Sequence, residues 1–174
     1  MTFPMYDASI PTMTRALGHL AAILQKAADH AAAKSIDPAV LLESRLYPDM
    51  FPLYKQVQRT TDIAKAGAAR LAQTQSHAQT PPPVFDDNET TFPDLIERVR
   101  KTIAYLETLK PEQFEGAAER VITWQIGERT KSMQGLPHLQ QFVLPNFFFH
   151  ETTAYAILRH SGVKLGKRDF LGGF

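Results

Sequence analysis

Four long segments of the chain carry apolar residues at the spacing of an α-helix. Within each segment the apolar side chains recur every three or four positions, which places them on one face of a helix. A helix with one apolar face buries that face against other helices. The pattern therefore predicts four amphipathic helices, at residues 9–34, 49–73, 92–109 and 136–160.

Capping residues and prolines refine the ends of these helices. Ser9 and Asp49 stand where an N-terminal cap is expected. Thr91, followed three residues later by Asp94, has the pattern of a capping box. Pro145 lies inside the last predicted helix, and because a proline lacks the N–H of a helical hydrogen bond, it should kink the helix there.

The segments between the helices predict a small sheet and one long connection. Polar and apolar side chains alternate over residues 120–133 and turn at Gly127 and Glu128, as in a β-hairpin. Residues 72–88 are polar and contain three consecutive prolines, which favours an extended surface crossover. The predicted fold is all-α: an antiparallel four-helix bundle with a small β-hairpin before the last helix. We expect one domain that spans residues 1–174.

Composition and charge argue against several classes of protein. The chain has 174 residues, of which 44% are hydrophobic, with 19 basic and 18 acidic side chains. This balance lacks the basic surface of a nucleic-acid or anionic-membrane binder, so we expect neither as a partner. The chain has no cysteine, and therefore no disulfide and no thiolate nucleophile. No apolar run is long enough to span a bilayer, and we expect a cytoplasmic protein.

Three polar side chains interrupt the apolar faces of the second and fourth predicted helices. Asn146 and His150 are four residues apart on a strongly apolar segment, so they share one face of a helix. Gln56 lies between the apolar residues Leu53 and Val57 on the inward face of the second helix. If these two helices pack together, the three polar side chains converge in the core. They form either a buried hydrogen-bonded cluster or a site for a metal or a small molecule.

The other titratable side chains are weaker candidates for a functional site. The periodicity places Glu151 on a solvated face and the other histidines on exposed faces or in loops, among them His19, His77 and His138. The chain contains no glycine-rich phosphate loop, no serine nucleophile elbow, no His-Glu-x-x-His zinc helix and no calcium-binding loop. The cluster of Gln56, Asn146 and His150 is therefore the main candidate for chemistry.

Several stretches of the chain are similar to a known bacterial family. They include residues 46–53, with the sequence Leu-Tyr-Pro-Asp-Met-Phe-Pro-Leu, residues 88–92, and residues 144–167, which contain Pro-Asn-Phe-Phe-Phe-His. Together they resemble a family of unknown function within the DinB/YfiT-like superfamily of metalloenzymes, along nearly the whole chain. The resemblance implies a four-helix bundle of up-down-down-up topology, and a bacterial cytoplasmic protein that forms a homodimer.

The resemblance also implies where a metal would lie. Typical members of the superfamily hold a divalent metal with three histidines, one on the second helix and two spaced His-x-x-x-His on the last. The matching motifs place His150 at the second position of that pair, Asn146 at the first, and Gln56 at the position on the second helix. Amides thus replace two of the three ligands, so we expect no tightly bound metal and no other cofactor.

The candidate cluster supports interpretations from different classes. In the first, the protein binds a small ligand in a degenerate metal-site pocket formed by Gln56, Asn146 and His150. Whether it is also an enzyme stays open; in an enzyme, His150 is the catalytic candidate, as a general base. In the second, it is a non-catalytic structural or interaction protein that dimerises through helix faces. A further alternative, implied by the superfamily, is a metal-dependent thiol transferase or hydrolase.

Overall fold

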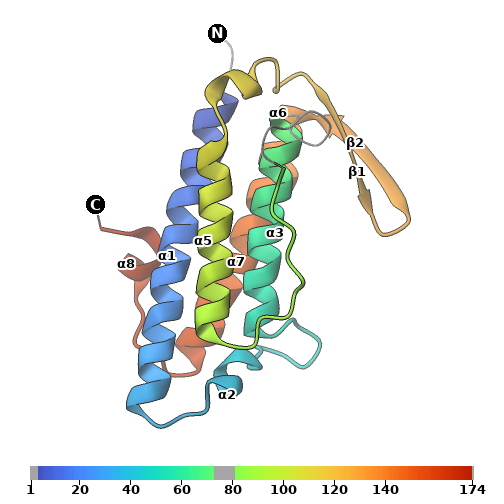
Figure 1. The fold of residues 1–174 in the computed structure, drawn as a ribbon. Helices are drawn as coiled ribbons and strands as arrows, with labels where there is room; N and C mark the ends of the chain where they lie inside the picture. The colour runs from blue at the N-terminus through green and yellow to red at the C-terminus, as the bar shows by residue number, and fades with distance from the viewer. Residues whose placement is uncertain (1–3, 73–80, 174) are drawn as a thin grey trace.

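Four long helices form a bundle (Figure 1). The computed structural model describes residues 4–72 and 81–173. Figure 1 shows two of the long helices running in one direction, α1 and α7, and two in the other, α3 and α5. The up-down-down-up topology implied by the family resemblance is therefore confirmed. The bounds are α1 (Met5–Ala33), α3 (Leu53–Leu71), α5 (Phe92–Thr108) and α7 (Leu144–His160).

Shorter helices connect and cover the bundle. Asp37 caps the first of them, and its carboxylate accepts a hydrogen bond from the Ala39 N–H at 2.9 Å. The last of them, α8, packs across α1 near the C-terminus (Figure 1). These elements are α2 (Pro38–Leu42), the 3-10 helix η1 (Pro111–Phe114), α6 (Gly135–Pro137), the π-helix η2 (His138–Val143) and α8 (Lys167–Leu171).

Two of the predicted helix starts are wrong. Helix α1 begins at Met5, so Ser9 lies inside the helix, where its hydroxyl donates a hydrogen bond to the Met5 carbonyl at 2.6 Å. Helix α3 begins at Leu53, and Asp49 lies in the turn before it. The reason is Pro52, because a proline disfavours the helical conformation in the residue before it.

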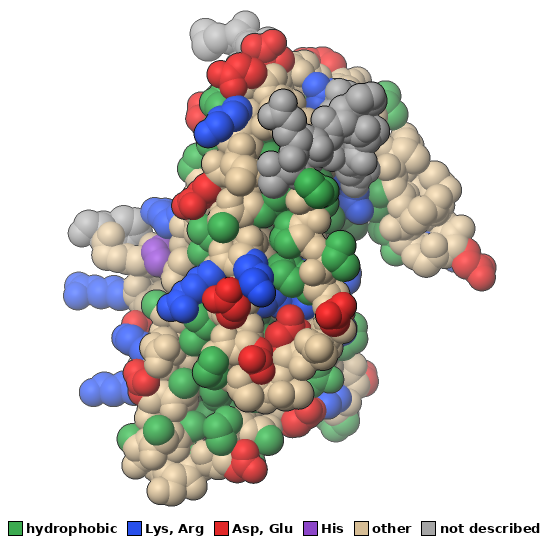
Figure 2. Space-filling model, viewed as in Figure 1, with side chains coloured by type: hydrophobic (Ala, Val, Ile, Leu, Met, Phe, Trp, Pro, Cys, Tyr) green, Lys and Arg blue, Asp and Glu red, His purple; other side chains and the backbone are tan. Residues whose placement is uncertain are grey.

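A long crossover joins α3 to α5, which pack side by side and run parallel. Its described part, residues 81–91, ends at the capping box of Thr91, which confirms that prediction. Arg98 of α5 holds the crossover, since its buried guanidinium donates to Asp87 at 2.7 Å and to Glu89 at 2.9 Å. Figure 2 shows acidic and basic side chains gathered over this face of the bundle. The simple antiparallel arrangement that periodicity alone favoured is therefore wrong for this pair of helices.

The predicted hairpin is confirmed. Strand β1 (Val121–Ile126) pairs antiparallel with β2 (Arg129–Gln134). The two residues between the strands are Gly127 and Glu128, and Gly127 has a φ of +57°, which a glycine adopts without strain. Trp124 of β1 is buried, so one face of the hairpin packs on the bundle.

The predicted fourth helix changes type just before Pro145. The residues ahead of it form the π-helix η2, and α7 follows, so Pro145 occupies the first turn of α7, where its missing N–H costs nothing.

Helix α3 approaches the end of η2 closely at Gly67. A Cβ added to Gly67 of α3 would lie 2.6 Å from a methyl carbon of Val143. Residue 67 must therefore lack a side chain for α3 to pack this closely on the start of α7.

The apolar residues around His150 are core residues with one exception. Leu53, Phe147 and Ile157 are buried, as predicted from the sequence. Phe149 is 57% exposed, so its predicted place in the core is wrong. The reason is helical geometry, since a residue two positions after Phe147 is rotated by about 200° around the helix. Among the helices of residues 4–72 and 81–173, none is long and apolar enough to cross a membrane.

Replacement of Phe147 by alanine should lower the free energy of unfolding by about 3–5 kcal/mol, because a fully buried ring would leave a cavity. Phe149→Ala is the matched control on the same helix and should cost less than about 1 kcal/mol. Urea denaturation of both variants measures the difference. Equal losses at the two positions would contradict the assignment of Phe147 to the core.

Candidate functional site

Two of the three predicted polar residues meet in the core. Gln56 of α3 and His150 of α7 are both buried, and His150 Nδ1 lies 2.7 Å from Gln56 Oε1. The amide nitrogen of Gln56 donates to the Phe51 carbonyl at 3.1 Å, which turns Oε1 toward the imidazole. Because a carbonyl oxygen only accepts, His150 Nδ1 carries the proton and donates a hydrogen bond to Gln56 Oε1.

This hydrogen bond leaves His150 with one reactive atom. In the neutral ring the lone pair is on Nε2, which makes no hydrogen bond within the described residues and is not sealed from solvent. Burial, together with the positive charge of Arg59, lowers the pKa of His150 to about 4. Two aromatic rings contact the imidazole, Phe51 at 6.4 Å and Phe149 at 5.1 Å between ring centres. At neutral pH the site thus presents an uncharged imidazole whose tautomer is set by Gln56.

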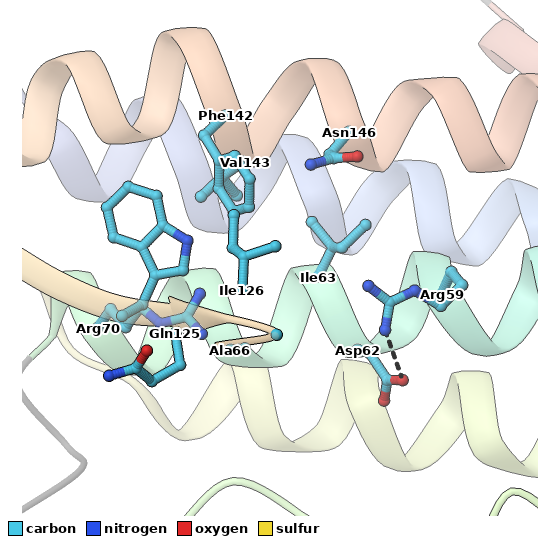
Figure 3. Close-up of a pocket in the computed structure, with 12 residues that line it drawn as sticks. Arg59, Asp62, Ile63, Ala66, Arg70, Gln125, Ile126, Phe142, Val143 and Asn146 are labelled. Atoms are coloured by element: carbon cyan, nitrogen blue, oxygen red, sulfur yellow. Dashed lines mark ion pairs between the residues drawn. The ribbon is translucent and has the colours of Figure 1, made fainter. Parts of the chain in front are cut away.

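Asn146 occupies a different position. Within the part of the chain that the structure describes, no hydrogen bond joins it to Gln56 or to His150. It lines a neighbouring groove between α3, α7 and the hairpin, and its amide extends from α7 toward Ile63 and Arg59 of α3 (Figure 3). The structure therefore pairs Gln56 with His150 directly and places Asn146 in the adjoining groove.

The groove has a volume of about 450 Å³. One stripe of α3 forms its floor, because positions 59, 62, 63, 66 and 70 recur at the period of a helix. Figure 3 shows Arg59 and Arg70 at the two ends of this stripe, with Ile63 and Ala66 between them. The hairpin contributes Trp124, and α7 with η2 contributes the opposite wall.

The groove carries more positive charge and more free donors than its one carboxylate balances. Asp62 lies 3.9 Å from Arg59, but it binds more closely to Arg98 at 2.8 Å and to Lys65 at 3.1 Å. Among the described residues, Arg70 Nε is buried without a hydrogen-bond partner, and burial lowers the pKa of this guanidinium. The indole N–H of Trp124 is likewise buried with no partner in that part of the chain. Such groups favour a ligand that accepts hydrogen bonds and carries negative charge.

Sequence reasoning missed Arg59, Arg70 and Trp124. Arginines on a helix are usually solvated, and a tryptophan in an alternating strand predicts only a buried face. The one available signal was their spacing. Arg59 and Arg70 are eleven residues apart, which is three helical turns, and so they share a face with Ile63 and Ala66. Which residues this face of α3 contacts depends on where the hairpin packs, and the sequence does not predict that.

His138 is buried, so its predicted exposure is wrong. It belongs to the π-helix and packs against Trp124 and Phe142, with ring centres 4.4 Å and 5.5 Å away. Burial and the charge of Arg70 lower its pKa to about 4. The cause is the hairpin, which folds over this helix and covers the imidazole. His77 lies outside the described residues.

Glu151 is also buried, and its predicted solvated position is wrong. Its side chain is 1% exposed, and neither carboxyl oxygen has a hydrogen-bond partner in the structure. Burial raises its pKa to about 8. It lies next to His150 in sequence but lines a cavity on another side of α7, between α1 and α8.

The residues at the family's metal positions do not fit a zinc centre. His150 offers one lone pair, and Gln56 uses its carbonyl oxygen to bind His150. Among the described residues, no group of three or more histidine, aspartate or glutamate side chains is placed to hold a metal ion. One imidazole is a weak site for a borderline cation.

Acid should weaken the fold through His150. Its pKa is about 4 in the folded protein and about 6.5 in an unfolded chain, so the unfolded state takes up the proton first as the pH falls. Relative to His150→Gln, the wild type should lose up to about 3 kcal/mol of stability between pH 6.5 and pH 4. Denaturation at several pH values measures this difference, with His160→Gln at the exposed end of α7 as the control. An unchanged difference across this range would contradict a buried neutral His150.

Comparison with known proteins agrees with this fold. A family model described as a domain of unknown function, DUF1993, matches residues 5–171. A crystal structure of a DinB family member protein from Shewanella denitrificans is similar to this chain, with a TM-score of 0.88 and 40% sequence identity. The similarity covers 97% of this chain and 92% of that one. No curated protein matches the sequence significantly. The chain therefore belongs to the DUF1993 family, and it has the helical fold of the DinB proteins with a two-stranded hairpin before the last long helix.

Proposed function

We propose that the protein binds a small organic anion with an apolar or aromatic body in the groove between α3, α7 and the hairpin. The observation that carries the proposal is Arg70 on the groove floor, whose Nε is buried with no hydrogen-bond partner among residues 4–72 and 81–173. A buried donor on a cation is costly to leave unpaired, and an anionic acceptor would satisfy it. Arg59 supplies a second cation at the other end of the groove.

The size and lining of the groove favour this class of ligand. Its volume of about 450 Å³ is within the range of small-molecule sites, roughly 300–1,000 Å³. Apolar side chains make up much of its wall, and Trp124 offers an aromatic surface against which a planar ligand packs. Asn146 adds both a donor and an acceptor for orienting the ligand. The apolar lining groups are Ile63, Ala66, Trp124, Ile126, Phe142 and Val143.

The pair of Gln56 and His150 gives the site its chemical function. These two residues do not line the groove themselves; neutral His150 keeps its lone pair on Nε2 beside the groove, while Gln56 holds the ring in place. The positive charge of Arg59 acts on both His150 and the groove, which links the two parts of the site. If the bound molecule reacts, His150 is the group that takes up its proton.

A fluorescent anion tests the proposal directly. Anilinonaphthalene sulfonate combines an aromatic body with a sulfonate, and the chain contains one tryptophan, Trp124, at the groove wall. Energy transfer from Trp124 to the dye therefore reports binding near the groove. We expect Arg70→Met to weaken binding about tenfold or more, because it removes the charge and keeps the apolar stem.

Two controls make this experiment specific. Arg100→Met removes an exposed cation from α5, away from the groove, and should leave the affinity unchanged. N-phenyl-1-naphthylamine, the neutral analogue of the dye, should bind Arg70→Met and the wild type equally. Circular dichroism confirms that each variant folds. If the neutral and anionic dyes bind the wild type with equal affinity, the groove does not recognise charge and the proposal is wrong.

The proposed site works without a tightly bound metal, and elemental analysis tests this. Protein purified without chelator and without an affinity tag should contain less than one equivalent of zinc or nickel, because two of the family's three ligand positions hold amides. His150→Ala should change the affinity for the dye or the stability, with no change in metal content. Stoichiometric zinc or nickel that is lost in His150→Ala would overturn the metal-free site.

A further inference from the structure

A second cavity lies between α1, α7 and α8 and shares no lining residue with the groove. Its volume is about 120 Å³, enough for a molecule of a few heavy atoms. Helix α8 forms one wall, and Figure 1 shows this helix lying against α1. An ion pair between Lys26 of α1 and Asp169 of α8 ties the two helices together. Asp169 also accepts a hydrogen bond from the Gly166 N–H at 2.7 Å, which orders the start of α8.

Glu151 is the buried acidic group of this cavity. Its side chain is 1% exposed, and both carboxyl oxygens are buried without a hydrogen-bond partner in the structure. A carboxyl group left in this state costs free energy in either protonation state, and more when it is charged. A cationic donor bound beside the carboxyl group would satisfy it.

His19 of α1 also lines the cavity. Its Nδ1 lies 3.0 Å from the Phe170 carbonyl oxygen, and because that oxygen only accepts, Nδ1 carries the proton. The lone pair of the neutral ring is therefore on Nε2. The ring lies against Gly172, where an added Cβ would be 2.5 Å from Nε2, and Gly172 has a φ of +80°. The C-terminal segment thus holds the imidazole in a fixed orientation.

The remaining lining groups fit an organic cation. Phe148 and Phe170 contribute aromatic rings, whose faces attract cations, and Thr12 contributes a hydroxyl. Arg15 also lines the cavity, but this side chain is exposed, so its charge is solvated at the rim of the cavity. Two ligands, Glu151 and His19, are too few for a tight metal site. An ammonium group, with its N–H donors, matches the carboxyl and the hydroxyl.

We propose that the cavity binds the ammonium group of a short primary amine, with Glu151 as the counter-ion. This site is independent of the groove and of the function proposed for it. Because burial raises the pKa of Glu151 to about 8, the free protein holds a proton there at pH 7. Binding of an ammonium ion converts Glu151 to the carboxylate and releases that proton to the solvent. The charge of the cavity rises by the ammonium and falls by the proton, so it stays balanced.

Titration calorimetry with ethylammonium chloride at pH 7 tests the proposal on the intact chain. Measured in two buffers that differ in ionisation enthalpy, binding should release close to one proton per ethylammonium bound. Glu151→Gln keeps the size of the side chain and removes its titration, so this variant should bind at least about tenfold more weakly and release no proton. Circular dichroism of this variant confirms its fold.

Three outcomes would overturn the proposal. The first is ethylammonium that binds Glu151→Gln as tightly as the wild type. The second is equal binding of tetramethylammonium, which has no N–H donor and is larger, because this would place the cation on the surface. The third is proton release by sodium chloride at the same concentration, since the site would then recognise charge without recognising an amine. Dye binding in the groove should be unaffected by Glu151→Gln, so a failure here does not bear on the groove.

Discussion

The arrangement of the helices depends on one buried guanidinium, that of Arg98 in α5. All five of its N–H donors have acceptors, among them Thr61 Oγ1 at 2.7 Å and carboxylates of Asp62, Asp87 and Glu89. Burial alone would lower the pKa of Arg98, but its hydrogen bonds to Glu89 and Asp87 and the negative charges of Asp62 and Glu89 outweigh burial and raise the pKa. A buried cation is tolerated only with such complete pairing. The same contacts join α5, α3 and the crossover, which lets α3 and α5 pack in parallel.

This pairing also shapes the groove on the other side of α3. Asp62 belongs both to the cluster around Arg98 and to the groove, and its short contacts are with Arg98 and Lys65. It therefore does little to neutralise Arg59, 3.9 Å away, and the groove keeps excess positive charge. The close packing of Gly67 on Val143 then brings α7 near enough to form the second wall. The groove is thus a consequence of how α3 is shared between two neighbours.

Burial decides the protonation of the side chains that matter most. His138 and His150 are neutral because the bundle and the nearby arginines lower their pKa values to about 4. The pKa of Glu151 shifts in the opposite direction, since burial raises it to about 8. Each shift disfavours the charged form, as expected in surroundings of low polarity. The buried histidines and Glu151 on η2 and α7 are therefore mainly uncharged at neutral pH.

Much of the fold follows from the sequence by itself, because it depends on local rules. The four apolar stripes, the capping box at Thr91 and the turn at Gly127 all act within a few residues, and each is where the pattern places it. The spacing of Asn146 and His150 likewise marked one side of α7, and Gln56 the facing side of α3. Only the tertiary structure decided which of them meet, that Arg59 and Arg70 line a groove, and that His138 and Glu151 are buried. Those outcomes depend on contacts between residues far apart in the chain, made when the hairpin and α8 dock on the bundle, and no local pattern encodes such contacts.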